Sequence, residues 1–383
     1  MAQKLAQDKG DERDIKEAVE RARPMSVLSD KFFRQGVAKV EGVLMEMNEE
    51  VLPNLPLKKE KIAKELSLFV DWSGKNVEMD LLGLYSHGRV LSFNLAFSDK
   101  YGNIYNYISV KGLGMPERSE VAERRNEPIE KDEKKGAWGL QEYWGAKAEW
   151  EASNEFLKNG IQTSVPIAII RLDSITLRGE RKSVKELKEQ GIIPQNIEYD
   201  DELHDYQPVI YLVGFSEMMR IRDARRDDYE QFADSHKMKF QEYVKWWSDK
   251  LAVNIAKLHN LGKVHTYMTD HNLTLDGCFV DNDGVRDLGK PEKTLGRERE
   301  ITDVLFQIPI FFAETREDVK TAADMRKCRM DFLRKYLENR ENLEKKGLWD
   351  LRYELTLTGL NEEIKVVEEV YEKKFGNKML DDL

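Results

Sequence analysis

The spacing of apolar positions changes along the chain, and these changes predict its organisation. Over residues 11–75, apolar side chains recur every three or four positions among charged ones, which predicts short helices separated by prolines. From about residue 77 to 112 the period shortens and turn signals occur, which predicts three strands of an antiparallel meander. A helix is then predicted from about residue 140 to 159, ended by Gly160.

The second half of the chain places two apolar strands around a polar stretch and then becomes helical. VPIAIIRL and VIYLVGF predict the strands, and the polar stretch runs over about 176–206. Beyond Lys237 the pattern is mainly helical, with a loop and hairpin at 263–287 and an amphipathic helix at 361–374. The sequence therefore predicts an α+β protein of three parts: a helical N-terminal extension at 1–75, a β-rich lobe at 76–215 and a helical lobe at 216–383.

Composition narrows the class of protein. The 61 basic and 71 acidic side chains give a net charge of −10, which argues against a protein that coats nucleic acid. No run of about 18 apolar residues is present, and the charged N-terminal sequence lacks the apolar stretch of a secretory signal. The cysteines, Cys278 and Cys328, cannot form a disulfide framework or a cysteine-based metal site. We expect a cytoplasmic globular protein that binds neither nucleic acid nor a membrane.

Candidate chemistry is concentrated in residues 255–284, IAKLHNLGKVHTYMTDHNLTLDGCFVDNDG. Asn272 and Asp281 lie on either side of a turn at Asp276-Gly277, so a hairpin would bring an amide oxygen and a carboxylate to the same end. Hard oxygen ligands with open coordination positions suit Mg²⁺ that carries the phosphates of a nucleotide. The segment therefore predicts a magnesium–nucleotide site.

The same segment is similar to the catalytic loop of protein kinases. His265 and Asn272 have the spacing of H-R-D-x-x-x-x-N, and Asp281-Asn282-Asp283-Gly284 stands where D-F-G would be. Tyr267 replaces the catalytic aspartate, and a phenol is a poor general base at neutral pH. An ordinary protein kinase is therefore not expected.

The sequence more closely resembles the selenoprotein O family, the pseudokinase-like protein adenylyltransferases. The family loop G-F-A-H-G-V-M-N-T-D-N has the length of residues 262–272, and eight residues then precede Asp281, as in the family. Three further blocks precede this loop in the family order. They resemble the family motifs G-D-G-R, Q-L-K-G-x-G and I-R-E-F-L-x-S-E-A-M-x-x-L-G-I-P-T-T and lie at residues 86–89, 109–114 and 147–164. The resemblance covers about residues 84–285.

This resemblance implies a protein-kinase-like bilobal fold, with a small antiparallel-sheet N-lobe and a helical C-lobe. It also implies ATP and Mg²⁺ as cofactors and the transfer of AMP to hydroxyl groups of a protein acceptor, which the sequence does not identify. By position, Lys111 and its helix partner Glu149 would hold phosphates, and Arg89 would contact them. Asn272 and Asp281 would bind Mg²⁺.

The resemblance leaves the general base and some arginines open. The family's base directly precedes the asparagine, where this chain has His271, and Asp270 lies one residue earlier. Either side chain can accept a proton. Arg118, Arg220 and Arg222 are candidates for phosphate-binding arginines.

Two other functions would use the same residues. A phosphotransferase would move the γ-phosphate of ATP to a protein or a small molecule, with the same lysine and metal ligands. A catalytically inactive, ATP-binding pseudokinase would act as an interaction module, and Tyr267 would then mark the loss of catalysis. The sequence does not separate these three functions.

Overall fold

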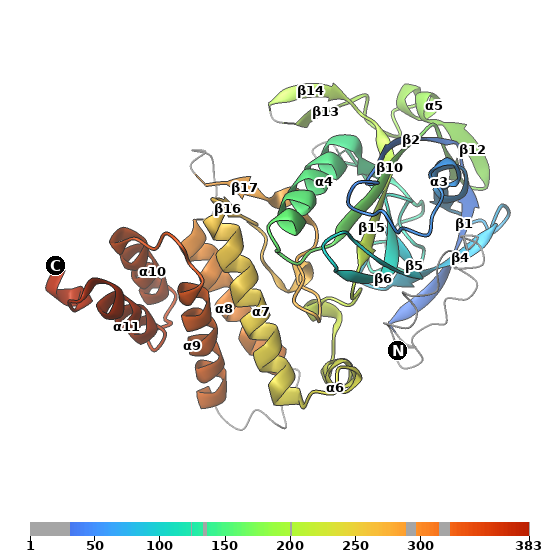
Figure 1. The fold of residues 1–383 in the computed structure, drawn as a ribbon. Coiled ribbons are helices and arrows are strands. Elements are labelled where there is room, and N and C mark those ends of the chain that lie inside the picture. Colours follow the sequence, from blue (N-terminus) through green and yellow to red (C-terminus); the bar gives the residue numbers. More distant parts are fainter. Residues whose placement is uncertain are drawn as a thin grey trace. The chain divides into compact units, whose positions relative to one another are not determined.

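The computed structural model describes residues 31–123, 125–132, 136–199, 201–288, 296–313 and 322–382. They divide into two compact units. The first unit takes the described residues up to Asn154 together with Ser164–Met218, and the second takes Glu155–Thr163 and the described residues from Met219 onward. Strands dominate the first unit and helices the second (Figure 1), which confirms the predicted α+β class.

A nine-stranded antiparallel sheet forms the body of the first unit. The strand order is β2-β10-β15-β6-β5-β4-β1-β3, and β9 pairs with β15. All eight residues of β15, PVIYLVGF, are buried, as expected for an apolar strand with neighbours on both sides. The strands are β1 (Phe32–Lys39), β2 (Gly42–Met47), β3 (Leu68–Val70), β4 (Met79–Leu84), β5 (Val90–Ser98), β6 (Ile104–Lys111), β9 (Gln141–Glu142), β10 (Val165–Leu172) and β15 (Pro208–Phe215).

The first two strands are consecutive in sequence but lie far apart in the strand order. Only Val40 and Glu41 separate β1 from β2, yet β1 pairs with β4 and β3 while β2 pairs with β10. Two residues span at most about 7 Å. The two sides of the sheet must therefore approach each other at this corner, so the sheet curls on itself.

Helices and short hairpins complete the first unit. The helix α4 (Tyr143–Lys158) is tied to β2 by Glu46, whose carboxylate accepts hydrogen bonds from the Tyr143 hydroxyl at 2.9 Å and from Lys147 Nζ at 2.6 Å. The other elements are α3 (Lys59–Leu66), α5 (Val184–Glu189), β7 (Glu130–Asp132), β8 (Gly136–Trp138), β11 (Ser174–Leu177), β12 (Glu180–Ser183), β13 (Asn196–Tyr199) and β14 (Glu202–Asp205).

The second unit is built on α7, which packs on α9. The buried side of α7 carries Tyr243, Trp247, Leu251, Ile255 and Leu258, at helical spacing. The elements are η1 (Ile221–Asp223), α6 (Arg226–Ser235), α7 (Phe240–Asn260), β16 (Lys263–Val264), η2 (Asp270–Asn272), η3 (Asn282–Gly284), β17 (Arg286–Asp287), α8 (Arg297–Ala313), α9 (Ala322–Glu338), α10 (Lys345–Leu357), α11 (Ile364–Phe375) and η4 (Met379–Asp382).

The structure corrects one prediction and confirms others. The prediction of a helical segment at 11–75 is wrong from residue 32 onward, because the strands β1, β2 and β3 lie there. Among the described residues of this segment, α3 is the one helix. Residues 11–30 lie outside the described residues. In β1 the side chains of Phe33, Gln35 and Val37 are buried in alternation, which is the period of a strand. The three strands predicted at 77–112 are confirmed as β4, β5 and β6.

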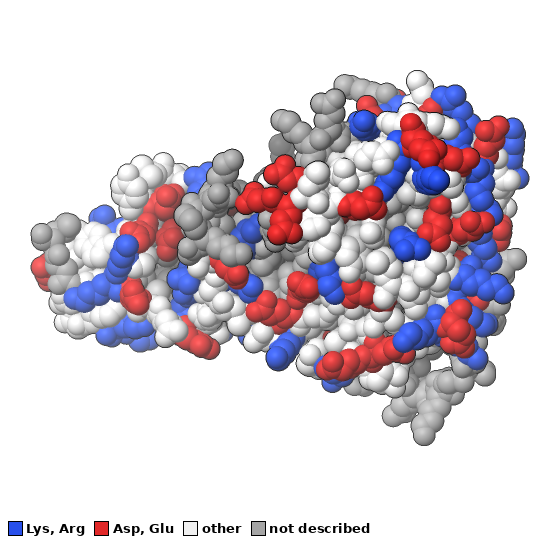
Figure 2. All heavy atoms as spheres, turned by 90° about the horizontal axis from the view of Figure 1, so that it is seen from above, with Lys and Arg blue, Asp and Glu red and all other residues white. Residues whose placement is uncertain are grey.

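Charge is mixed over the face of the molecule drawn in Figure 2, where Lys and Arg side chains are interspersed with Asp and Glu. Of the helices that the structure describes, none combines the length and the apolar character required to cross a membrane.

Candidate active site

Lys111 and Glu149 form a buried ion pair within the first unit. Lys111 Nζ lies 2.8 Å from Glu149 Oε1 and 2.9 Å from Oε2, and both side chains are 3 % exposed. Lys111 is the last residue of β6, and Glu149 lies in α4. The structure therefore brings together the two residues that the resemblance pairs. A charge-assisted contact to both carboxylate oxygens fixes the position of the ammonium group.

The backbone beside this pair requires a glycine. Gly112 follows Lys111 with φ of 90°, and a Cβ there would lie 2.4 Å from the carbonyl oxygen of Val209. The Gly112 N–H donates to the carbonyl oxygen of Arg89 at 3.0 Å. Arg89 therefore lies at the same end of the sheet as Lys111, and its Nη1 donates to the Leu140 carbonyl oxygen at 3.0 Å.

The predicted catalytic loop lies in the second unit, between β16 and η3. His265 is fully buried, as expected of a structural residue. Thr266 has φ of 66°, and its hydroxyl donates to the carbonyl oxygen of Gly284 at 2.7 Å. The Asn272 side-chain amide donates to the carbonyl oxygen of Tyr267 at 2.9 Å. These contacts fold the loop back on itself and give it a defined shape.

Glu300 of α8 anchors the start of this loop, although no sequence pattern predicts that role. Its Oε1 accepts the backbone N–H of His265 at 2.7 Å and of Thr266 at 3.2 Å. Its Oε2 accepts the Nε2–H of His259 at 2.7 Å. Burial lowers the pKa of His259, so the ring is neutral at pH 7 and its Nδ1 accepts the Tyr336 hydroxyl at 2.7 Å. Groups from α7, α8 and α9 together fix the loop.

The two predicted metal ligands, Asn272 and Asp281, are neighbours in the fold, because the Val280 N–H donates to the Asn272 carbonyl oxygen at 3.1 Å. Asp281 has φ of 56° and ψ of 55°, a left-handed conformation that is uncommon outside glycine. Its Oδ2 lies 2.9 Å from Arg220 Nη1, which also donates to the His271 carbonyl oxygen at 2.8 Å. The predicted phosphate ligand Arg220 is thus an ion-pair partner of the predicted metal ligand.

The oxygen atoms of Asn272 and Asp281 are of the chemical type that Mg²⁺ prefers as ligands. The Asn272 amide nitrogen is engaged by Tyr267, which leaves its Oδ1 as an acceptor, and Asp281 supplies carboxylate oxygens. Within the described ranges, no three His, Cys, Asp or Glu side chains come together as a metal site. One or two protein ligands are usual where nucleotide phosphates and water complete the coordination of Mg²⁺.

The two candidate bases, Asp270 and His271, have different surroundings. Arg222 Nη1 lies 2.9 Å from both ring nitrogens of His271. Because a guanidinium can only donate, it engages a nitrogen that a base would need. The contact of the Asp270 carboxylate is longer than those of the His271 ring: its Oδ1 lies 3.9 Å from His271 Nε2. The backbone N–H of Asp270 donates to the side chain of Gln307. Asp270 therefore keeps its proton-accepting oxygens.

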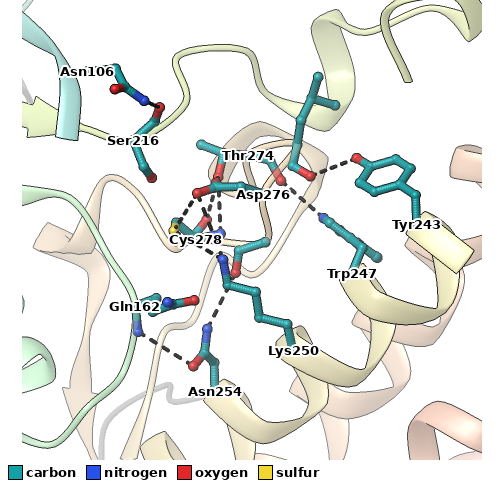
Figure 3. Close-up of polar contacts among 12 residues, drawn as sticks. Asn106, Gln162, Ser216, Tyr243, Trp247, Lys250, Asn254, Thr274, Asp276 and Cys278 are labelled. Carbon is teal, nitrogen blue, oxygen red and sulfur yellow. Dashed lines mark hydrogen bonds and ion pairs between the residues drawn. The ribbon is translucent and has the colours of Figure 1, made fainter. Parts of the chain in front are cut away.

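The turn at Thr274–Cys278, which joins the two predicted metal ligands, is braced by α7 (Figure 3). The Thr274 hydroxyl donates to Asp276 and accepts the Cys278 N–H at 3.0 Å. From α7, Trp247 Nε1 donates to the Thr274 carbonyl oxygen at 3.1 Å, and Lys250 Nζ lies 3.8 Å from Asp276 Oδ2. These contacts hold the hairpin that ends in Asp281.

Comparisons with known proteins find similar structures at low identity. No protein-family model and no curated protein matches the chain. WaaP in complex with acyl carrier protein is 12 % identical, with a TM-score of 0.31, and the match covers 73 % of this chain and 89 % of that chain. The Toxoplasma gondii specific rhoptry antigen kinase domain is 11 % identical, with a TM-score of 0.36, over 74 % and 85 % of the two chains. The ROP18 kinase domain in complex with AMP-PNP and sucrose is 14 % identical, with a TM-score of 0.34, over 76 % and 77 %. TM-scores of this size say nothing about what this chain binds or does.

Proposed function

We propose that this protein is an ATP- and Mg²⁺-dependent transferase of the protein-kinase-like class that transfers AMP from ATP to hydroxyl groups of a protein. The observation that carries the proposal is the Lys111–Glu149 ion pair, with both side chains 3 % exposed. Buried ion pairs contribute little to stability compared with apolar residues of similar volume. A pair at a strand end therefore calls for another role, and a fixed lysine ammonium suits phosphate oxygens.

In the second unit, Asn272 and Asp281 would hold Mg²⁺. The ion would neutralise the charge that develops on the phosphates during transfer. Arg220, 2.9 Å from Asp281, would supply a further positive charge to phosphate oxygens. Arg89 would have the same role in the first unit.

Asp270 is the general base in this proposal. It would accept the proton of the acceptor hydroxyl, and it is favoured over His271 because Arg222 lies 2.9 Å from both ring nitrogens of that histidine. Changing Asp270 to Asn should lower the transfer rate by about 10²–10⁴-fold, the usual contribution of a general base. Changing His271 to Gln should have a smaller effect. A larger loss in the His271 variant would reverse the assignment.

The transfer of AMP, as opposed to phosphate, rests on the resemblance of residues 86–89, 109–114, 147–164 and 262–281 to selenoprotein O. A γ-phosphotransferase and an inactive ATP-binding protein remain the alternatives, because both would keep Lys111, Asn272 and Asp281. The three functions differ in what becomes attached to protein.

Intact-protein mass spectrometry after incubation with ATP, with and without Mg²⁺, tests the proposal. We expect a Mg²⁺-dependent gain equal to AMP on the chain itself or on added proteins. A gain equal to one phosphate would show a phosphotransferase. If ATP binds but no mass is gained on this chain or on proteins of a cell extract, the pseudokinase alternative is favoured.

Two pairs of variants link the transfer to named residues. Asp281→Asn should abolish the Mg²⁺-dependent gain, whereas Asp283→Asn, two residues away and exposed, should not. Lys111→Met should also abolish it, whereas the exposed Lys100, which pairs with Glu50, should tolerate the same change. Normal transfer by the Asp281 variant would disprove the metal assignment.

A further inference from the structure

A polar cavity lies within the second unit, apart from the residues proposed for transfer. Its volume is about 230 Å³. It is enclosed by the last turn of α7, the first turns of α8 and α10, and the end of α9. The charged side chains that line it are Arg297, Glu298, Arg340 and Glu344.

Two arginines of this cavity lack hydrogen-bond partners for buried nitrogen atoms. Arg340 is 8 % exposed, and neither its Nε nor its Nη1 has a partner among the described residues. The Nε of Arg297 is buried and unpartnered in the same way. The ring of Tyr336 lies 5.8 Å from Arg340 Cζ, but a ring face does not satisfy N–H groups in the guanidinium plane. Burying a charged donor without an acceptor is costly.

The two guanidinium groups also repel each other. Burial and the neighbouring charge of Arg340 lower the pKa of Arg297. The carboxylates of Glu298 and Glu344 act in the opposite direction, but neither forms an ion pair with Arg297 or Arg340 among the residues that the structure describes. The cavity thus holds two positive charges whose direct counter-ion is not supplied by the described part of the chain.

Two other polar side chains of the cavity, those of His259 and Asn260, already have partners. His259 bonds Tyr336 and Glu300, and the Asn260 side chain donates to Asn339 and accepts from Glu341. Residues near the N-terminal ends of α8 and α10 also line the cavity, and the N-cap of α10 forms no side-chain hydrogen bond. The donors of the cavity that lack a partner are therefore N–H groups of the two arginines, which favour an anion.

We propose that this cavity binds a phosphate group, either as inorganic phosphate or as a small phosphate ester, between Arg297 and Arg340. Guanidinium groups match phosphate oxygens with two parallel hydrogen bonds, and an anion between them would remove their repulsion. Glu298 and Glu344 would accept hydrogen bonds from the hydroxyl groups of an ester. The proposal is independent of the transferase function.

Isothermal titration of the full chain with inorganic phosphate, against sodium chloride at equal ionic strength, tests the site. We expect saturable binding by the wild type and a loss of at least about tenfold in affinity in Arg340→Gln and in Arg297→Gln. Arg334→Gln is the matched control and should bind normally, because Arg334 lies in α9, six residues before Arg340, and is partly exposed and paired with Asp331. Titration with glycerol 3-phosphate distinguishes an ester site from a site for free phosphate.

The proposed nucleotide-binding residues give a second control. Lys111→Met should leave phosphate affinity unchanged, because Lys111 belongs to the first unit. The proposal is overturned if the wild type shows no saturable binding, if both arginine variants bind as the wild type does, or if Lys111→Met alone removes binding. Because each arginine variant removes buried N–H groups that have no partner, phosphate-free melting temperatures should not fall below the Arg334 control. A fall in both would show that the arginines are already satisfied.

Discussion

Removing one partner of the Lys111–Glu149 pair should destabilise the first unit strongly. Both side chains are 3 % exposed, so Glu149→Gln leaves a buried ammonium group without its carboxylate. Breaking a buried ion pair in this way costs about 3–5 kcal/mol. At about 2–4 °C per kcal/mol for a domain of this size, the first unit should melt roughly 6–20 °C lower.

Removing both charges should cost much less than the two single changes together. In Lys111→Met with Glu149→Gln, an apolar chain replaces the lysine and no unpaired charge is left. A neutral replacement of a buried pair is often tolerated. The double-mutant cycle should therefore give a coupling energy of at least about 2 kcal/mol.

Urea titrations followed by hydrogen exchange of peptides from β6 and α4 would measure the free energy of unfolding of the first unit separately from that of the second. Lys147→Met is the matched control, because Lys147 pairs with Glu46 at 2.6 Å from the same helix but is 28 % exposed. That change should cost no more than about 1 kcal/mol. A Glu149→Gln variant as stable as this control, or additive effects in the double variant, would refute the reasoning.

Three further outcomes are expected. Gly112→Ala should destabilise the first unit by more than about 2 kcal/mol in thermal melting, since the new Cβ would collide with the carbonyl oxygen of Val209. Gly102→Ala is the control: its φ is 87° and no atom lies near the new Cβ, so it measures the smaller cost of the backbone conformation alone. Burial lowers the pKa of His259 below its ordinary 6.5, so below about pH 6.5 the unfolded state binds a proton more readily than the folded state and the free energy of unfolding falls. Urea titrations should show a loss of up to about 1.4 kcal/mol of this free energy per pH unit. His259→Gln should reduce this pH dependence, and His236→Gln should not. Glu300→Gln should cost about 1–3 kcal/mol and increase hydrogen exchange of the loop, because the amide nitrogen of glutamine would replace one of the two accepting oxygens and face a donor, either His259 Nε2–H or the loop N–H groups. Unchanged exchange would disprove the anchoring role.

Sequence patterns predicted the elements whose apolar letters either alternate with polar ones or form an unbroken run. β5, β6, β10 and β15 are such elements, and Lys111 and Glu149 were paired through blocks that keep the order of a known family. In β1, the alternation of apolar letters is interrupted by Gln35, which is 5 % exposed and bonds the backbone of Gly36 and Glu117. Phe33, Val37 and Val40 alone are spaced as in a helix. A buried polar side chain thus concealed a strand.

The missed parts of the candidate site depend on contacts between distant segments. Glu300 lies in the charged run REREI, where nothing local separates it from exposed neighbours, and its burial follows from the packing of α8 near the loop. The contact between Arg220 and Asp281 joins positions on either side of α7. No periodicity or spacing rule predicts such pairs.

The corner between β1 and β2 also bears on how the chain is made. β2 leaves the ribosome before β10, the strand with which it pairs, and β10 follows roughly 120 residues later. At about 5–20 residues per second, this interval is roughly 6–24 s. Throughout it, the backbone groups of β2 that later bond β10 have no native partner. The sheet therefore closes only after β10 and β15 have been synthesised, and any fragment that stops before them carries an open strand edge that can pair with another chain.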